Sequence, residues 1–168
     1  MTSEKLTIKY VVGDATAPQG EGLKIIAHCC NNLGAWGAGF VLALSRKWER
    51  PEKEYRAWCE GHGQEEFQKL LGATQLVPVE ENIWVANIIG QDGVGRRKDG
   101  TPPIRYDKLG VGFGHIANYA NGNPEKNVSV HAPRIGCGLA GGEWPEVERL
   151  LNQHLVDKGV PVTIYDLP

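Results

Sequence analysis

Residues 127–145 read NVSVHAPRIGCGLAGGEWP, and the fold class follows from how this stretch is built. Residues 127–131 predict a strand, Trp144 and Pro145 predict the start of a helix, and a glycine-rich loop lies between them. Residues 136–141 match the pattern GxGxxG, whose glycines let the backbone approach a phosphate beside a helix N-terminus. This context favours an anion-binding loop over the alternative, a tight turn that only packs the helix against the strand.

Two other nucleotide-binding patterns fit poorly. The dinucleotide-binding fingerprint belongs in the first βαβ unit, whereas this loop lies near the C-terminus with one strand after it. The sequence contains no GK[ST] motif, so a P-loop NTPase is excluded as an interpretation of the motif.

A second glycine-rich loop follows the apolar run 23–28 (LKIIAH), which is typical of a strand buried on both faces. Residues 31–40 of this loop read NNLGAWGAGF. The asparagine amides suit sugar hydroxyls, and the alternative is that they only cap the following helix. A third loop, residues 13–16 (GDAT), carries a carboxylate suited to an adenine amino group, or else forms a plain Asx turn.

Strands and helices alternate along the chain, which predicts an α/β fold with helices on both faces of a mostly parallel sheet. Ligands of such sheets bind outside the carboxyl ends of the strands, so the three loops are expected to share one rim. Together they outline a site for an ADP-containing ligand. We expect strands at residues 6–12, 23–28, 73–79, 83–89, 127–131 and 160–165, and helices at 40–48, 51–60, 106–120 and 144–155.

The composition is that of an ordinary globular protein. With 168 residues, 41% hydrophobic and 23% charged, the chain is expected to form one domain, residues 1–168. Apolar runs fall well short of the roughly 20 residues that span a bilayer, and the N-terminus lacks a signal-peptide apolar region. We therefore expect a cytoplasmic protein without a membrane partner.

Charge and cysteine usage exclude further classes of partner. The formal net charge is −2, and the one basic cluster, residues 96–98 (RRK), lacks interleaved aromatic residues, so nucleic acid binding is not predicted. The four cysteines have no CxxC spacing, and no metal-ligand spacing links them to the five histidines. The sequence predicts reduced thiols, no metal and no cofactor.

The chain resembles the macrodomain family over nearly its whole length. The matching segments are VVGDAT at 11–16, LKIIAHCCNNLGAWGAGF at 23–40, VHAPRIGCGLAGG at 130–142 and VTIYDL at 162–167. The resemblance points to the branch that contains the terminal ADP-ribose protein glycohydrolase, its bacterial relatives and the yeast-type ADP-ribose-1″-phosphate phosphatase. It implies a three-layer α/β/α sandwich around a mixed, mostly parallel sheet of about six strands.

The resemblance also implies a ligand and its contacts, with ADP-ribose or an ADP-ribosylated protein as the partner. Asp14 would bind the adenine amino group, with Ala15 beside it. The remaining contacts would be Asn32, Gly37, Ala38, Gly39 and Phe40 at the distal ribose, Ile135, Gly136, Cys137, Gly138 and Leu139 at the diphosphate, and Tyr165 and Leu167 at the adenine.

Two departures from the family pattern bear on the mechanism. The glycohydrolase carries an aspartate where this chain has Ala140, and a catalytic lysine in a region where this chain has no lysine before Lys98. Because alanine can act neither as acid, base nor nucleophile, the lysine–aspartate mechanism cannot be carried over. The candidates for side-chain catalysis are Asn32, Asp92 and His28, whose ordinary alternatives are ribose binding, a solvated loop carboxylate and a hydrogen-bonded core histidine.

Three functions fit this sequence. The first is an ADP-ribosyl hydrolase that removes ADP-ribose from carboxylate esters, on protein glutamate or aspartate or as O-acyl ADP-ribose. An ester can be hydrolysed mainly by orienting the bond and a water, with backbone donors stabilising the developing anion. The alternatives are a reader module that binds ADP-ribose without turnover and an ADP-ribose-1″-phosphate phosphatase. The sequence leaves the physiological target, the linkage preference and the oligomeric state open.

Overall fold

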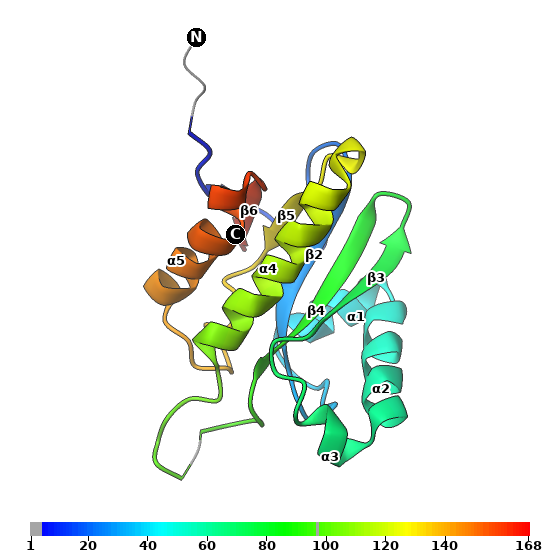
Figure 1. Cartoon of the computed structure of the whole chain (residues 1–168), viewed down its shortest axis with the longest axis vertical. Helices are drawn as coiled ribbons and strands as arrows, with labels where there is room; N and C mark the ends of the chain where they lie inside the picture. The colour runs from blue at the N-terminus through cyan, green and yellow to red at the C-terminus, as the bar shows by residue number, and fades with distance from the viewer. Residues whose placement is uncertain (1–4, 97) are drawn as a thin grey trace.

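The computed structural model describes residues 5–96 and 98–168 (Figure 1). Residues 1–4 and Arg97 of the basic cluster lie outside these ranges, so what the sequence predicts for them stays a prediction. No helix within the described ranges is long and apolar enough to cross a membrane.

The described chain forms one six-stranded sheet with the strand order β1-β6-β5-β2-β4-β3. Every neighbouring pair is parallel except β3 and β4, which are antiparallel. This arrangement confirms the predicted mixed, mostly parallel sheet. The strands are β1 (Lys9–Val12), β2 (Lys24–Asn31), β3 (Thr74–Glu80), β4 (Ile83–Gln91), β5 (Ser129–Ala132) and β6 (Val162–Asp166).

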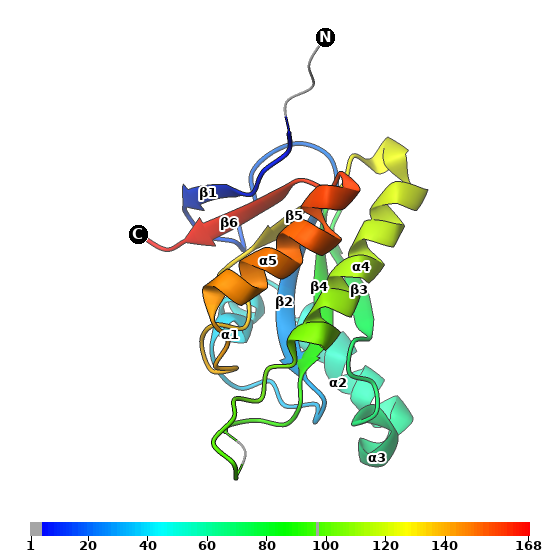
Figure 2. The same ribbon diagram turned by 60° about the vertical axis from the view of Figure 1, so that its left-hand side comes forward.

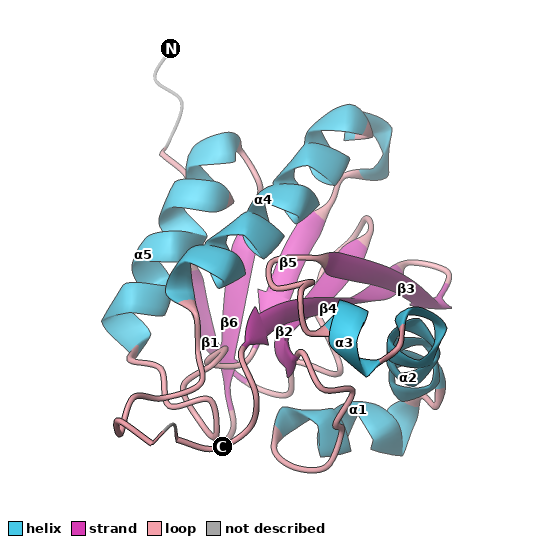
Figure 3. Ribbon diagram, turned by 60° about the horizontal axis from the view of Figure 1, so that its bottom comes forward, coloured by secondary structure: helices cyan, strands magenta, loops and turns pink. Residues whose placement is uncertain are grey.

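Helices cover both faces of the sheet, as predicted. Helices α4 (Tyr106–Gly122) and α5 (Trp144–His154) lie on one face, and α1 (Phe40–Lys47) and α2 (Arg50–His62) lie on the other (Figures 2 and 3). The sequence did not predict the short helix α3 (Gln64–Phe67) or the two 3-10 turns η1 (Pro124–Lys126) and η2 (Val156–Lys158). The result is the three-layer α/β/α sandwich that the resemblance implies.

Strand β2 lies at the centre and separates two apolar cores. Ile25 and Ala27 pack in the core beneath α4 and α5, whereas Ile26 and Cys30 pack in the core beneath α1 and α2. Since successive side chains of a strand point to opposite faces, an unbroken apolar run fills both cores at once. The strand extends three residues beyond its predicted end and so carries Asn31 to the carboxyl edge.

Glycines in α4 allow that helix to lie close to its neighbours. A Cβ on Gly112 would collide with Ile88 of β4, and a Cβ on Gly110 would lie 2.8 Å from His154 Nε2 on α5. These residues cost helix propensity but permit close packing between the layers.

Candidate functional site

The two glycine-rich loops face each other across a cavity of about 470 Å³ at the carboxyl edge of the parallel strands. This first cavity is bounded on one side by the loop that follows β2 and on the other by the loop that follows β5, with the end of β6 beside them. In Figure 3 these loops and the C-terminus lie together at the lower edge. The predicted contact residues that line it are Ala38, Gly39, Phe40, Ile135, Gly136, Cys137, Gly138, Leu139, Tyr165 and Leu167.

A second cavity of about 320 Å³ continues from the first. The two share five wall residues, which are Cys29, Ala38, Val41, Gln91 and Leu139. Gly37, also a predicted contact, lines this second cavity, as do Trp36 and Val94. Cysteines apart, its lining contains no ionisable side chain. A ligand that fills both cavities would therefore pass Leu139, from the first cavity, whose wall includes charged residues, into the second, whose wall is neutral.

The loop after β5 has the free donors that an anion needs. It closes on itself through hydrogen bonds from Gly142 N to Gly136 O (2.7 Å) and from Gly141 N to Gly138 O (3.0 Å). Within the described ranges, the backbone N–H groups of Gly136, Gly138 and Leu139 donate to no protein acceptor. Unpaired backbone donors must be satisfied by water or a ligand, so this loop can bind a phosphate.

Asn31 and Tyr55 hold the loop after β2 in place. Asn31 Oδ1 accepts hydrogen bonds from the backbone N–H groups of Leu33 and Ala35, and its Nδ2 donates to Ala35 O. The buried Tyr55 hydroxyl of α2 donates to Asn31 O (2.5 Å) and accepts from Gly34 N (3.1 Å). The oxygen and the nitrogen of the Asn31 side-chain amide are thus both used inside the loop.

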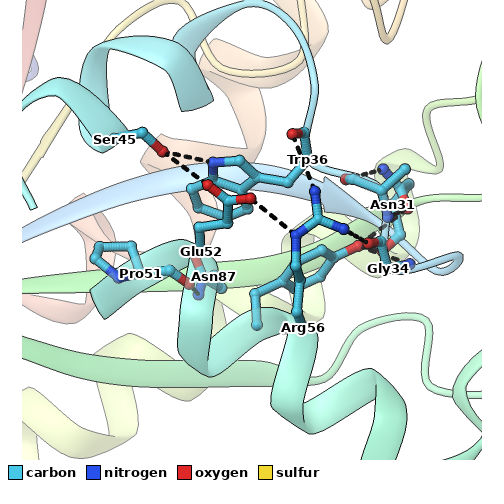
Figure 4. A network of polar contacts seen from close by, with 10 residues as sticks. Asn31, Gly34, Trp36, Ser45, Pro51, Glu52, Arg56 and Asn87 are labelled. Carbon is cyan, nitrogen blue, oxygen red and sulfur yellow. Dashed lines mark hydrogen bonds and ion pairs between the residues drawn. The ribbon is translucent and has the colours of Figure 1, made fainter. Parts of the chain in front are cut away.

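Arg56 of α2 fixes the outer part of the same loop (Figure 4). Its guanidinium donates to Gly34 O and Trp36 O and is paired with Glu52 at 2.8 Å. The Trp36 indole N–H donates to Ser45 Oγ at 2.9 Å, which anchors the wall of the second cavity to α1. Gln64 of α3 adds a further anchor by donating to Leu33 O at 2.8 Å, so α1, α2 and α3 together hold this loop against their layer.

Asn32 does not line either cavity. Its side chain is almost completely buried, and Nδ2 donates to Gln68 O (3.0 Å) and to Asp92 Oδ1 (3.1 Å). Its Oδ1 accepts from Gly93 N at 2.8 Å. Asn32 therefore joins the turn after β4 to the rest of the edge, and its ribose contact stays a prediction.

Asp92 likewise lies outside both cavities. Besides accepting from Asn32, its carboxylate lies 3.8 Å from the Arg105 guanidinium. Its neighbour Gln91 lines both cavities and was not singled out from the sequence. The Gln91 Nε2 donates to Gly93 O (2.9 Å), whereas Oε1 of that amide accepts from no residue of the described ranges. Its position at the carboxyl end of a central strand is the signal that could have identified it.

His28 lines the first cavity from β2 and is 2% exposed. Asn87 donates its amide hydrogens to Pro51 O and Gln75 Oε1, so its Oδ1 accepts from His28 Nε2 at 2.5 Å. Burial lowers the pKa of His28 to about 4, although the bond to Asn87 acts in the opposite direction. The imidazole is neutral near pH 7, with Nδ1 as its acceptor.

Asp14 and Ala15 lie beside the cavity rather than in its wall. Thr16 donates to Asp14 Oδ1 from both its hydroxyl and its backbone N–H, which forms the Asx turn and lowers the pKa of this carboxyl. The exposed Oδ2 has no hydrogen bond to any residue of the described ranges. A Cβ on Gly13 would lie 3.5 Å from the ring of Tyr165, which lines the cavity, so Asp14 follows a residue beside that wall.

Arg134 and Asp166 add a charged pair to the wall that sequence reasoning did not identify. The guanidinium forms two hydrogen bonds of 2.9 Å to the Asp166 carboxylate, and the bonds lower the pKa of Asp166. It also lies over the rings of Tyr10 (5.1 Å) and Trp144 (4.7 Å). The pair joins β6 to the start of the loop after β5.

The thiols at the cavity are protonated. Burial raises the pKa of Cys29 to about 12 and also raises the pKa of Cys137. A thiol is a poor nucleophile in this form. In the described part of the chain, no group of three histidine, cysteine, aspartate or glutamate residues could hold a metal ion.

Comparison with known proteins shows which family the chain belongs to. No protein-family model matches the chain. The ADP-ribose 1''-phosphate phosphatase of Meyerozyma guilliermondii is 30% identical, over 89% of this chain and 94% of that protein. The chromodomain-helicase-DNA-binding protein 1-like of Danio rerio is 33% identical over 97% of this chain, which spans only 16% of that protein.

A solved structure agrees in both sequence and fold. The macrodomain protein from Streptomyces coelicolor is 51% identical, with a TM-score of 0.78, over 95% of this chain and 98% of that one. The mixed sheet, the two glycine-rich loops and these relatives lead to one conclusion. The chain belongs to the macrodomain family.

Proposed function

We propose that this macrodomain binds ADP-ribose and hydrolyses carboxylate esters of ADP-ribose, on protein glutamate or aspartate or as O-acyl ADP-ribose. The observation that carries the proposal is the pair of joined cavities, with unpaired backbone donors at Gly136, Gly138 and Leu139 between them. A charged diphosphate suits the donors, and neutral groups at either end suit the remaining walls.

The ligand would lie along the carboxyl edge of the sheet. Its adenine would contact Tyr165 and Leu167, with the free Oδ2 of Asp14 accepting from the 6-amino group. The diphosphate would occupy the loop at 135–139. The distal ribose would then reach the second cavity beside Gly37 and Ala38, where the ester bond would meet Gln91.

Catalysis would depend on orientation of a water rather than on a charged nucleophile. Ala140 offers no acid or base, and Asn32 and Asp92 are bound to each other in the turn after β4. The free Oε1 of Gln91 would accept a hydrogen bond from the attacking water. Asn32 would act indirectly, by positioning Gln91. Asn32 Oδ1 accepts a hydrogen bond from Gly93 N–H, and Gly93 O accepts one from the Gln91 side-chain amide.

The comparisons favour a second candidate, an ADP-ribose-1″-phosphate phosphatase, since a relative of that name aligns over nearly its whole length. The neutral lining of the second cavity argues for an ester instead. A phosphate monoester carries close to two negative charges near pH 7, and no lysine or arginine in this lining would offset them.

The deciding experiment measures release of ADP-ribose from a glutamate-linked ADP-ribosylated protein, with ADP-ribose 1″-phosphate as the competing substrate. Release from the ester together with about 100-fold slower turnover in Gln91→Leu, at unchanged ADP-ribose affinity, would support the proposal. The Gly114→Ala variant is the control, because a Cβ there meets no atom within 4 Å. Faster release of phosphate from the 1″-phosphate would favour the phosphatase, and binding without turnover would favour a reader.

A further inference from the structure

A chain of buried polar groups runs from the sheet interior to the cavity wall. Ser129 Oγ lies 2.7 Å from His131 Nε2, and His131 Nδ1 lies 2.7 Å from the Tyr165 hydroxyl. The same hydroxyl lies 2.9 Å from the backbone nitrogen of Gln19. His131 and Tyr165 are both 3% exposed, so the bond between them is buried, whereas the bonds to Ser129 and Gln19 are partly buried.

One arrangement of hydrogens gives the buried Tyr165 O–H an acceptor among the described residues and leaves the O–H of the partly exposed Ser129 to solvent. Gln19 N–H can only donate, so the Tyr165 oxygen accepts from it. The Tyr165 O–H then needs an acceptor, and His131 Nδ1 is the one within reach. His131 consequently carries its hydrogen on Nε2 and donates it to Ser129 Oγ. Burial lowers the pKa of His131 to about 4, which keeps the ring neutral and Nδ1 an acceptor.

The Tyr165 hydroxyl thereby joins three separate parts of the cavity rim. His131 belongs to β5 and Tyr165 to β6, whereas Gln19 belongs to the loop after β1 that also carries Asp14. The ring of Tyr165 also supports Gly13, the residue before Asp14. A hydroxyl that accepts from one element and donates to another fixes the distance between them.

We propose that His131 is a positioning residue that orients Tyr165 and, through it, the Asp14 loop, and so sets the selectivity of the site for adenine. This inference rests on the proposed function, in which Asp14 and Tyr165 contact the base. Asp14 accepts from the 6-amino group of adenine but faces a carbonyl oxygen in hypoxanthine. A correctly placed Asp14 therefore prefers ADP-ribose to inosine diphosphate ribose by about ten-fold or more.

The test compares the affinities of these two ligands by calorimetry in three variants. His131→Leu removes the acceptor, Tyr165→Phe removes only the hydroxyl, and His131→Asn keeps an acceptor near the position of Nδ1. We expect the ratio of affinities to fall below about three-fold in His131→Leu and Tyr165→Phe and to stay near the wild-type value in His131→Asn. Rescue by asparagine would not be expected if His131 only filled space.

The outcomes separate the two proposals. A wild-type ratio in both His131→Leu and Tyr165→Phe, or an equal loss in His131→Leu and His131→Asn, would overturn the role of His131. If the wild-type protein binds neither ligand, the proposed function itself is overturned. Should His131→Leu fail to fold, Tyr165→Phe decides alone, because it deletes a single oxygen atom.

Discussion

Substituting Gly136 by alanine tests whether the conformation of the loop after β5 depends on one glycine. Gly136 has a φ of 72°, and a Cβ there would lie 2.6 Å from Ile104 Cδ1. The left-handed backbone costs a residue with a Cβ about 1–2 kcal/mol. Overpacking against Ile104 adds about 1–3 kcal/mol. We therefore expect a loss of about 3 kcal/mol in the free energy of unfolding, which lowers Tm by about 6–12 °C.

A double-mutant cycle separates the two costs. Ile104→Val removes Cδ1 and by itself costs about 1 kcal/mol. In the Gly136→Ala, Ile104→Val double variant the next atom, Cγ1, lies 3.7 Å from the new Cβ, an ordinary contact. The collision is then gone and only the backbone strain remains, so the pair should be more stable than additivity predicts by about 1–2 kcal/mol.

The assays are urea unfolding for the free energy of unfolding and thermal unfolding for Tm, both followed by circular dichroism, with Gly138→Ala as the matched control. A Cβ on Gly138 meets no atom within 4 Å, and its φ is not left-handed, so Tm should change by less than about 2 °C. A Gly136→Ala protein as stable as the wild type, or strictly additive effects in the double variant, would refute the reasoning.

Three further predictions concern stability. Gly112→Ala should destabilise the protein by about 2 kcal/mol in urea unfolding, because the Cβ collides with Ile88. Gly114→Ala in the same helix should stabilise it by about 0.5–1 kcal/mol, because a Cβ there meets no atom within 4 Å. Tyr55→Phe should lower the free energy of unfolding by about 1–3 kcal/mol, because it leaves Gly34 N–H without its acceptor. The control is Tyr119→Phe, whose hydroxyl has no hydrogen bond within the described ranges and which should lower it by less than about 0.5 kcal/mol. The pKa of both His28 and His131 is about 4 in the folded protein against 6.5 for an ordinary histidine, so the unfolded chain takes up protons first as the pH falls. The free energy of unfolding should therefore fall between pH 6.5 and pH 4, by on the order of 3 kcal/mol per histidine. A constant urea midpoint over that range would contradict this prediction.

Most of the fold could be predicted from the periodicity of apolar residues and from the composition of the loops. The apolar run at 23–28 was correctly assigned to a strand buried on both faces, because a short unbroken apolar run is typical of such a strand. Helix α4 was predicted in spite of its glycines, but their purpose could not be inferred. Gly110 and Gly112 matter because α5 and β4 approach them, and that proximity exists only after the chain has folded.

The site was predicted less completely, for a related reason. The GxGxxG stretch and the loop at 31–40 can be recognised from their glycine-rich composition, and residues of both line the cavities. Asn32 and Gln91 are neighbours in space but 59 positions apart in sequence, and only the register of β2 with β4 brings them together. The charged pair of Arg134 and Asp166 likewise depends on two strands that are distant in the sequence.

The direction of β6 has a practical consequence for handling the protein. Because β6 runs toward the cavity, its last residue, Asp166, and the following Leu167 form part of the wall, and Leu167 is 77% exposed. A fluorophore or surface anchor attached after Pro168 would stand at the entrance and compete with the ligand. Strand β1 is parallel to β6, so its first residue, Lys9, lies at the opposite edge of the sheet. An anchor attached before β1 would leave the entrance open, which makes that side the better choice for immobilised binding assays.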